Sequence, residues 1–212
     1  MCMGASQCAW GQVDAEMVTI MGRNALSVDD YLTAIKYFNQ AIDAKPFLSR
    51  PYYYRAFAKF TLEDYLGAEA DCSKSIELNP FIAEVYQLRG LCRIHNVNYK
   101  GAIEDYSRSL KEHPDDQGAR YNRALCYLQN KEYANADIDL DYLLKRWPNY
   151  YRVYMIKAQS LLEQKDTTQS MVWIDSLLVK NPKEGNAWSF KGKYAINKQE
   201  YLSLIHISEP TR

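Results

Sequence analysis

The chain has 212 residues, of which 47% are hydrophobic and 25% are charged, an ordinary globular composition. Lysine plus arginine equals aspartate plus glutamate at 26 each, and this zero net charge argues against a nucleic-acid binder, which carries a basic excess. No apolar run approaches the ~18 residues that a membrane span needs.

Residues 1–14 read MCMGASQCAWGQVD and contain a small-x-small pattern at Ala9-Trp10-Gly11. This pattern resembles the cleavage site of a secretory signal, although the basic region is absent and the apolar stretch is short. We expect the remnant of a truncated signal peptide, with a disordered end as the alternative. A signal would place the protein outside the cytoplasm, in a bacterial periplasm or cell envelope, and the alternative location is cytoplasmic.

Five prolines recur at intervals of 34 residues, at Pro46, Pro80, Pro114, Pro148 and Pro182. Because proline fixes φ and lacks an amide donor, a fixed interval marks the stop of a repeating structural unit. With each proline at position 32, the expected repeats are 15–48, 49–82, 83–116, 117–150, 151–184 and a partial repeat 185–201.

Each repeat is predicted to form two helices. Position 8 is always glycine or alanine, which lets two helices approach closely. In the third repeat Tyr99, Ala102, Tyr106 and Leu110 recur at the three- and four-residue steps of one helical face. The pattern indicates a helix of about 13 residues, a short turn, a second similar helix and a proline-marked stop.

This pattern closely resembles the tetratricopeptide repeat family. The third repeat carries nearly every signature position of the family, including Tyr86, Gly90, Tyr99, Ala102, Tyr106 and Pro114. The resemblance covers residues 15 to 201. It implies an all-α solenoid of antiparallel helix pairs wound into a right-handed superhelix, with the first helices lining a concave groove.

Opposite charges recur at positions 7 and 23. The matched residues are Arg55 with Asp71, Arg89 with Asp105 and Arg123 with Asp139, and repeats that lack the arginine also lack the aspartate. The matching favours structural ion pairs between the two helices of a hairpin, because a guanidinium fork suits a carboxylate. The alternative is a cationic stripe that binds an anionic ligand.

By resemblance, positions 2, 5, 9 and 12 face the concave groove. Aromatic and aliphatic side chains there, flanked by arginines, suit an extended or helical peptide, and the alternative is that some of them pack between helices. The predicted partner-binding residues are Arg50, Tyr53, Phe57, Gln87, Leu91, Tyr121, Leu125, Arg152 and Met155. The chaperone-binding clamp of the family is not supported, because Gln87, Leu91 and Ile156 occupy three of its slots.

Nothing in the sequence predicts an enzyme, a cofactor or a metal site. The histidines have no serine or cysteine partner in a catalytic motif, and there is no phosphate-binding glycine loop. The cysteines show no metal-binding spacing, and Cys72, Cys92 and Cys126 are expected to be small buried side chains.

The tail LSLIHISEPTR, residues 202–212, breaks the register and resembles the translation of a sequencing-library adapter. We therefore exclude it from functional argument. The sequence as a whole predicts a non-enzymatic scaffold that binds a peptide or protein, with neither nucleic acid nor a membrane span. The alternative is the adaptor portion of a larger enzyme or sensor whose catalytic domain follows residue 201.

Overall fold

A computed structural model describes residues 14–197. The expected signal remnant, apart from Asp14, lies outside the described residues, as do the last residues of the partial repeat and the adapter-like tail. Within the described range no helix is both long and apolar enough to cross a membrane.

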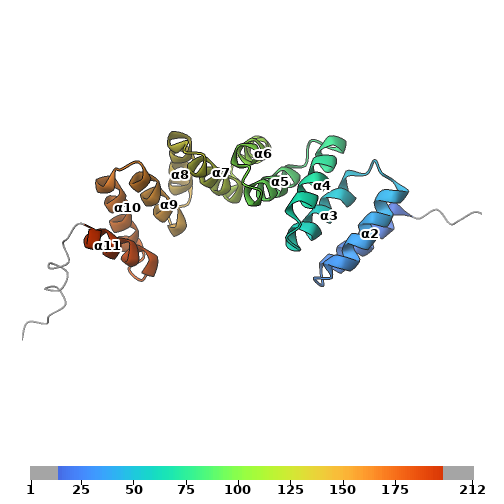
Figure 1. Cartoon of the computed structure of the whole chain (residues 1–212), viewed down its shortest axis with the longest axis horizontal. Coiled ribbons are helices and arrows are strands. Elements are labelled where there is room, and N and C mark those ends of the chain that lie inside the picture. The colour runs from blue at the N-terminus through green and yellow to red at the C-terminus, as the bar shows by residue number, and fades with distance from the viewer. Residues whose placement is uncertain (1–13, 198–212) are drawn as a thin grey trace, which may run out of the picture. The chain divides into compact units, whose positions relative to one another are not determined.

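The described residues form eleven α-helices and no strand (Figure 1), which confirms the all-α fold. Each first helix of a repeat packs against the second helix that follows it. The helices are α1 (Ala15–Leu26), α2 (Tyr31–Ala44), α3 (Ser49–Thr61), α4 (Tyr65–Leu78), α5 (Ala83–His95), α6 (Tyr99–Glu112), α7 (Gln117–Gln129), α8 (Tyr133–Arg146), α9 (Tyr151–Glu163), α10 (Thr167–Lys180) and α11 (Gly185–Asn197).

The chain divides into two compact bodies, an N-terminal body that ends at Ala119 and a C-terminal body that begins at Arg120. A buried cluster of the N-terminal body joins α3, α4 and α5 through Ala56, Cys72 and Val85. In the C-terminal body Ala158 and Ile174 belong to a second cluster, which includes residues of α9, α10 and α11. Within each body, neighbouring hairpins therefore share a buried apolar cluster, as stacked repeats require.

The turn inside each hairpin has one backbone conformation in all five complete repeats. Position 15 is left-handed each time, with φ of 58 to 65°, and the residues are Asp29, Glu63, Val97, Lys131 and Lys165. The next residue is the N-cap of the second helix. In four repeats its side chain accepts a hydrogen bond from the backbone N–H three residues on, and these residues are Asp30, Asp64, Asn98 and Asp166. This side-chain cap satisfies an N–H that has no partner within the helix.

The recurring prolines do more than stop a helix. The hydroxyl of Tyr86, at position 4 of the third repeat, donates to the carbonyl of Pro80 at 3.2 Å. Tyr52 and Tyr154 make the same bond to Pro46 and Pro148, at 3.2 and 3.0 Å, and the indole N–H of Trp188 donates to Pro182 at 2.9 Å. An aromatic residue at position 4 thus ties the start of one repeat to the stop of the preceding one.

Position 8 is small because an aromatic or aliphatic side chain at position 24 lies against it. A Cβ added to Gly22 would lie 2.4 Å from the Phe38 ring, and one added to Gly90 would lie 3.0 Å from Tyr106. Where position 8 is alanine, as in Ala124, the facing residue is the smaller Leu140, which shares its buried cluster. The two positions therefore compensate for each other in volume.

The three described cysteines are buried free thiols, as expected. Burial raises the pKa of the Cys126 thiol to about 12. The pKa of Cys72 is also raised, first by its hydrogen bond with Cys92 and then by burial. The Cys72 and Cys126 thiols are therefore protonated at neutral pH, and all three buried cysteines act as small apolar side chains.

Candidate functional site

Three of the predicted groove residues line one pocket in the C-terminal body. Tyr121 of α7 and Arg152 and Met155 of α9 border a cavity of about 650 Å³, and Phe190 and Lys193 of α11 close its other side. All five belong to first helices of repeats. The pocket thus combines aromatic rings, a flexible thioether and two cations on one face.

Tyr121 is half-buried at the edge of this pocket. Its ring lies at 42° to that of Tyr150, with centroids 5.5 Å apart. Burial raises the pKa of the Tyr121 hydroxyl, Tyr150 adds to the rise, and Arg152 opposes it. The hydroxyl therefore stays protonated at neutral pH, and the residue offers an apolar ring with a polar tip.

Glu184, the one acid among the described residues that border this pocket, is already engaged. The Glu184 carboxylate accepts hydrogen bonds from the side-chain amides of Asn181 at 3.2 Å and Asn186 at 3.3 Å. Arg152 and Lys193 make no ion pair with any residue in the described part of the chain.

A second pocket, of about 470 Å³, lies between α1 and α3 in the N-terminal body. The predicted residue Arg50 lines it, together with Arg23, Ile20 and Tyr54. The Arg23 guanidinium lies 5.4 Å from the centre of the Tyr54 ring, which holds that ring by a cation–π contact. This pocket too is bordered by first helices.

The other predicted groove residues line neither pocket. Tyr53 packs against the buried cluster of α3, α4 and α5, and burial raises the pKa of its hydroxyl. Phe57 is exposed on α3, whereas Leu91 and Leu125 are half-buried. The Gln87 amide donates to Ser109 at 2.8 Å and to Asp116 at 3.0 Å, so it joins structural elements of its own body.

Sequence reasoning missed Arg23, Tyr54, Phe190 and Lys193. Arg23 and Lys193 occupy position 9, one of the expected groove positions, in the first and last repeats, which the resemblance matches less fully. Tyr54 and Phe190 occupy position 6, which faces the pockets in both bodies. The expected groove positions therefore already pointed to Arg23 and Lys193, whereas position 6 was not among them.

The three arginine–aspartate pairs are present in the structure. The closest N–O distances are 2.6 Å for Arg55–Asp71, 2.6 Å for Arg89–Asp105 and 2.7 Å for Arg123–Asp139. Each pair joins the two helices of one hairpin, and each aspartate is buried.

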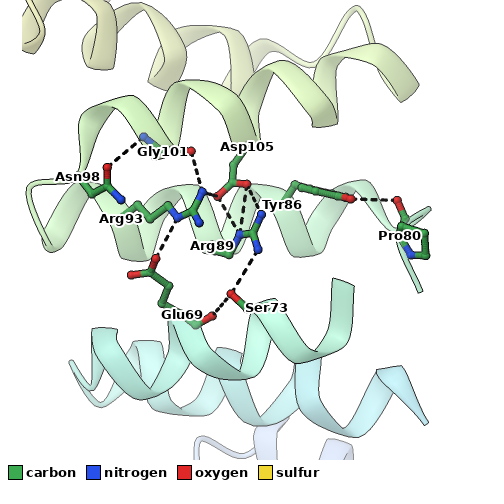
Figure 2. Close-up of polar contacts among 9 residues, drawn as sticks. All are labelled: Glu69, Ser73, Pro80, Tyr86, Arg89, Arg93, Asn98, Gly101 and Asp105. Carbon is green, nitrogen blue, oxygen red and sulfur yellow. Dashed lines mark hydrogen bonds and ion pairs between the residues drawn. The ribbon is translucent and has the colours of Figure 1, made fainter. Parts of the chain in front are cut away.

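Asp105 is the centre of a larger network, shown in Figure 2. It accepts hydrogen bonds from Arg89 and, at 2.9 Å, from Arg93, which also pairs with Glu69 of the preceding repeat at 2.9 Å. Burial raises the pKa of the Asp105 carboxyl, and the hydrogen bond and charge of Arg89 and then the charge of Arg93 oppose that rise. The acid is fully partnered by protein groups, which favours the structural interpretation of the charge pattern.

The lysines at position 7 have partners that the sequence pattern did not reveal. Lys157 pairs with Asp141 at 2.8 Å and Asp137 at 3.0 Å, and Lys191 pairs with Asp175 at 2.7 Å. These aspartates lie in the preceding repeat, at position 25 or 21 rather than 23. In these C-terminal repeats the acidic partner of the position-7 cation therefore belongs to the preceding hairpin, whereas in the arginine repeats it belongs to the same hairpin.

No group of three or more histidine, cysteine, aspartate or glutamate residues within residues 14–197 is arranged to hold a metal ion. In both bodies the hairpins share their caps, proline contacts and ion pairs at one register, and first helices border a pocket, which is the geometry of a helical repeat protein.

The comparisons identify the kind of repeat. A family model of the tetratricopeptide repeat matches residues 96–136. This match confirms the resemblance to the tetratricopeptide repeat that the sequence pattern indicated. No curated protein sequence matches it.

Solved structures of such proteins share its fold. The chain is similar to YrrB, a TPR protein with an unusual peptide-binding site, with a TM-score of 0.80 and 14% identity over 84% of this chain and 92% of that chain. It is also similar to MamA from Desulfovibrio magneticus RS-1, with a TM-score of 0.74 and 15% identity over 81% and 97% of the two chains. The chain is also similar to the first TPR of Spaghetti (RPAP3) bound to the HSP90 peptide SRMEEVD, with a TM-score of 0.54 and 26% identity over 55% of this chain and 93% of that chain.

Proposed function

We propose that this protein is a non-enzymatic scaffold that binds a peptide or protein segment on the face formed by its first helices. Two of the similar structures belong to proteins described with a peptide-binding site or a bound peptide, which supports this class of function. Fold alone does not assign a function, so the proposal depends on the pockets.

The observation that carries the proposal is the pocket of about 650 Å³ in the C-terminal body. Its volume lies within the ~300–1,000 Å³ typical of ligand sites. Met155 and Phe190 supply apolar contact, and Arg152 and Lys193 supply hydrogen-bond donors to a main chain or side chain. The pocket of about 470 Å³ between α1 and α3 offers the same kinds of group through Ile20, Tyr54 and Arg50.

Selection of random 12-residue peptides on the immobilised chain, followed by fluorescence polarisation, tests the proposal. Replacing Met155 and Phe190 together with alanine removes the apolar wall of the C-terminal pocket, and Ile20→Ala with Tyr54→Ala does so in the N-terminal one. Truncating a central contact residue costs more than ~1 kcal/mol, so peptides that use a pocket should bind about tenfold more weakly to its double variant.

Val179→Ser is the matched control, because Val179 is 82% exposed on the second helix α10. Circular dichroism verifies that each variant remains folded. Selected peptides that keep full affinity for both double variants, or a selection that yields no binding peptide, would contradict the proposed function.

A further inference from the structure

The pockets differ from the rest of the described surface in how their arginines are partnered. Six of the other described arginines form ion pairs with aspartate or glutamate, namely Arg55, Arg89, Arg93, Arg108, Arg120 and Arg123. Arg23, Arg50 and Arg152 pair with no carboxylate in the described range, and each lines one of the two pockets. A guanidinium presents a planar fork of donors that fits a carboxylate with two hydrogen bonds.

We propose that each body carries its own site for an acidic peptide segment, in which carboxylate side chains adjoin apolar ones. The inference rests on the proposed function and names the class of peptide. In the N-terminal body Arg23 and Arg50 would hold the carboxylates, and in the C-terminal body Arg152 and Lys193 would do so.

Charge supports this occupant. The chain as a whole has zero net charge, yet each pocket has two cations and one carboxylate, Glu16 in the N-terminal pocket and Glu184 in the C-terminal one. Because both oxygens of Glu184 already accept amide hydrogen bonds, that acid leaves the two pocket cations to a ligand. A local positive excess on a neutral protein attracts an anionic segment to the pocket rather than to the whole surface.

The apolar walls distinguish a peptide from a free anion. Ile20 is 47% exposed beside Arg23, and Met155 and Phe190 lie beside Arg152 and Lys193. An inorganic anion would leave these surfaces in water, whereas an aliphatic or aromatic side chain next to an acidic one would cover them. The nearby Glu16 and Glu184 also disfavour a phosphate group, whose charge is close to −2, more than a carboxylate with charge −1.

The test uses a blocked, fluorescein-labelled peptide, Gly-Asp-Phe-Glu-Leu-Asp-Gly, and an isosteric peptide with Asn and Gln in place of Asp and Glu. We expect calorimetry to give two acidic peptides per chain, and the isostere to bind about tenfold more weakly. Raising the salt concentration should weaken binding of the acidic peptide and leave the isostere unchanged.

Arg50→Gln and Arg152→Gln should each remove one of the two binding events, and the double variant should remove both. Lys111→Gln and Lys180→Gln remove the same charge from exposed sites of the two bodies and should retain both events. All four side chains are on helix surfaces, so the folded state survives.

Equal affinity for the isostere, or a stoichiometry unaffected by both arginine variants, would overturn this inference while leaving groove binding intact. A phosphoserine version of the peptide that binds more than tenfold tighter would overturn the choice of carboxylates. If peptides from the random selection bind and the acidic probe does not, only this inference fails. Failure of every peptide contradicts the proposed function as well.

Discussion

Replacing Asp105 with asparagine tests whether the buried charge pattern is structural. The Asp105 side chain is 2% exposed and lies 2.6 Å from Arg89 and 2.9 Å from Arg93. Asparagine keeps the shape of the side chain but removes its charge and one acceptor. Two guanidiniums would then remain at the α5–α6 contact without their common carboxylate.

Removing one partner of a buried ion pair costs ~3–5 kcal/mol, against ~0.2–1 kcal/mol for an exposed pair. The two arginine side chains retain 16% and 18% exposure, so water partly replaces the lost partner. Burial also raises the pKa of Asp105, which means that the carboxylate itself is desolvated and that its removal recovers some free energy. We therefore expect a loss of about 3 kcal/mol, at the lower end of the buried range.

Asp175→Asn is the matched control. Its partner Lys191 lies at 2.7 Å, but the two side chains are 56% and 41% exposed, so the expected loss is within ~0.2–1 kcal/mol. Because repeat arrays unfold in parts, denaturation followed by circular dichroism should be combined with hydrogen exchange of the α5 and α6 amides. A loss for Asp105→Asn no larger than that of the control, together with weaker peptide binding, would refute the structural interpretation and favour a ligand-binding charge stripe.

Three further substitutions test the local packing, each by denaturation. Gly22→Ala should destabilise the protein, because its Cβ would lie 2.4 Å from the Phe38 ring. The overpacking cost of ~1–3 kcal/mol exceeds the ~1 kcal/mol that alanine gains in helix propensity. Adding Phe38→Leu should restore stability, and failure to do so would refute the volume match between the two positions. Val97→Asn should stabilise by about 1 kcal/mol, because a β-branched residue is strained at φ 60°, and a loss would contradict this. Tyr86→Phe should cost ~0.5–1.5 kcal/mol by removing the donor to Pro80, and unchanged stability would deny that bond a role.

The sequence predicted the hairpins because their signals are local and periodic. Prolines end the second helices, small residues mark the close helix contact, and matched charges mark the pairs such as Arg89–Asp105. The left-handed turn residue escaped prediction because Val97 and Lys131 are not residue types that favour this conformation. The capped turn and the packed helices around it hold the backbone there, and this tertiary constraint leaves no residue-type signal.

The sequence register identified only some of the residues that line the pockets, for a different physical reason. The repeat register shows which positions share a helix face, but it does not show whether a side chain there is already bonded to a neighbouring residue. Gln87 occupies a groove position, yet its amide is engaged by Ser109 and Asp116, which come from elsewhere in the same body. Lys157 pairs with Asp141, which occupies position 25 of the preceding repeat. Such exchanges of partner depend on contacts between repeats, which a position-by-position comparison does not include.

The distribution of partnered cations is the reason to expect binding at the pockets rather than over all of the first helices. On α5 both Arg89 and Arg93 pair with acids, and on α7 Arg120 and Arg123 both pair with Asp139. These helices use their guanidiniums to join elements of the fold, so a ligand there would have to displace buried carboxylates. By contrast, the cations at positions 2 and 9 of α1, α3, α9 and α11 form no ion pair within the described residues. They are Arg23, Arg50, Arg152 and Lys193. Binding should therefore be sensitive to substitutions on those four helices, whereas the charged residues of α5 and α7 should govern stability.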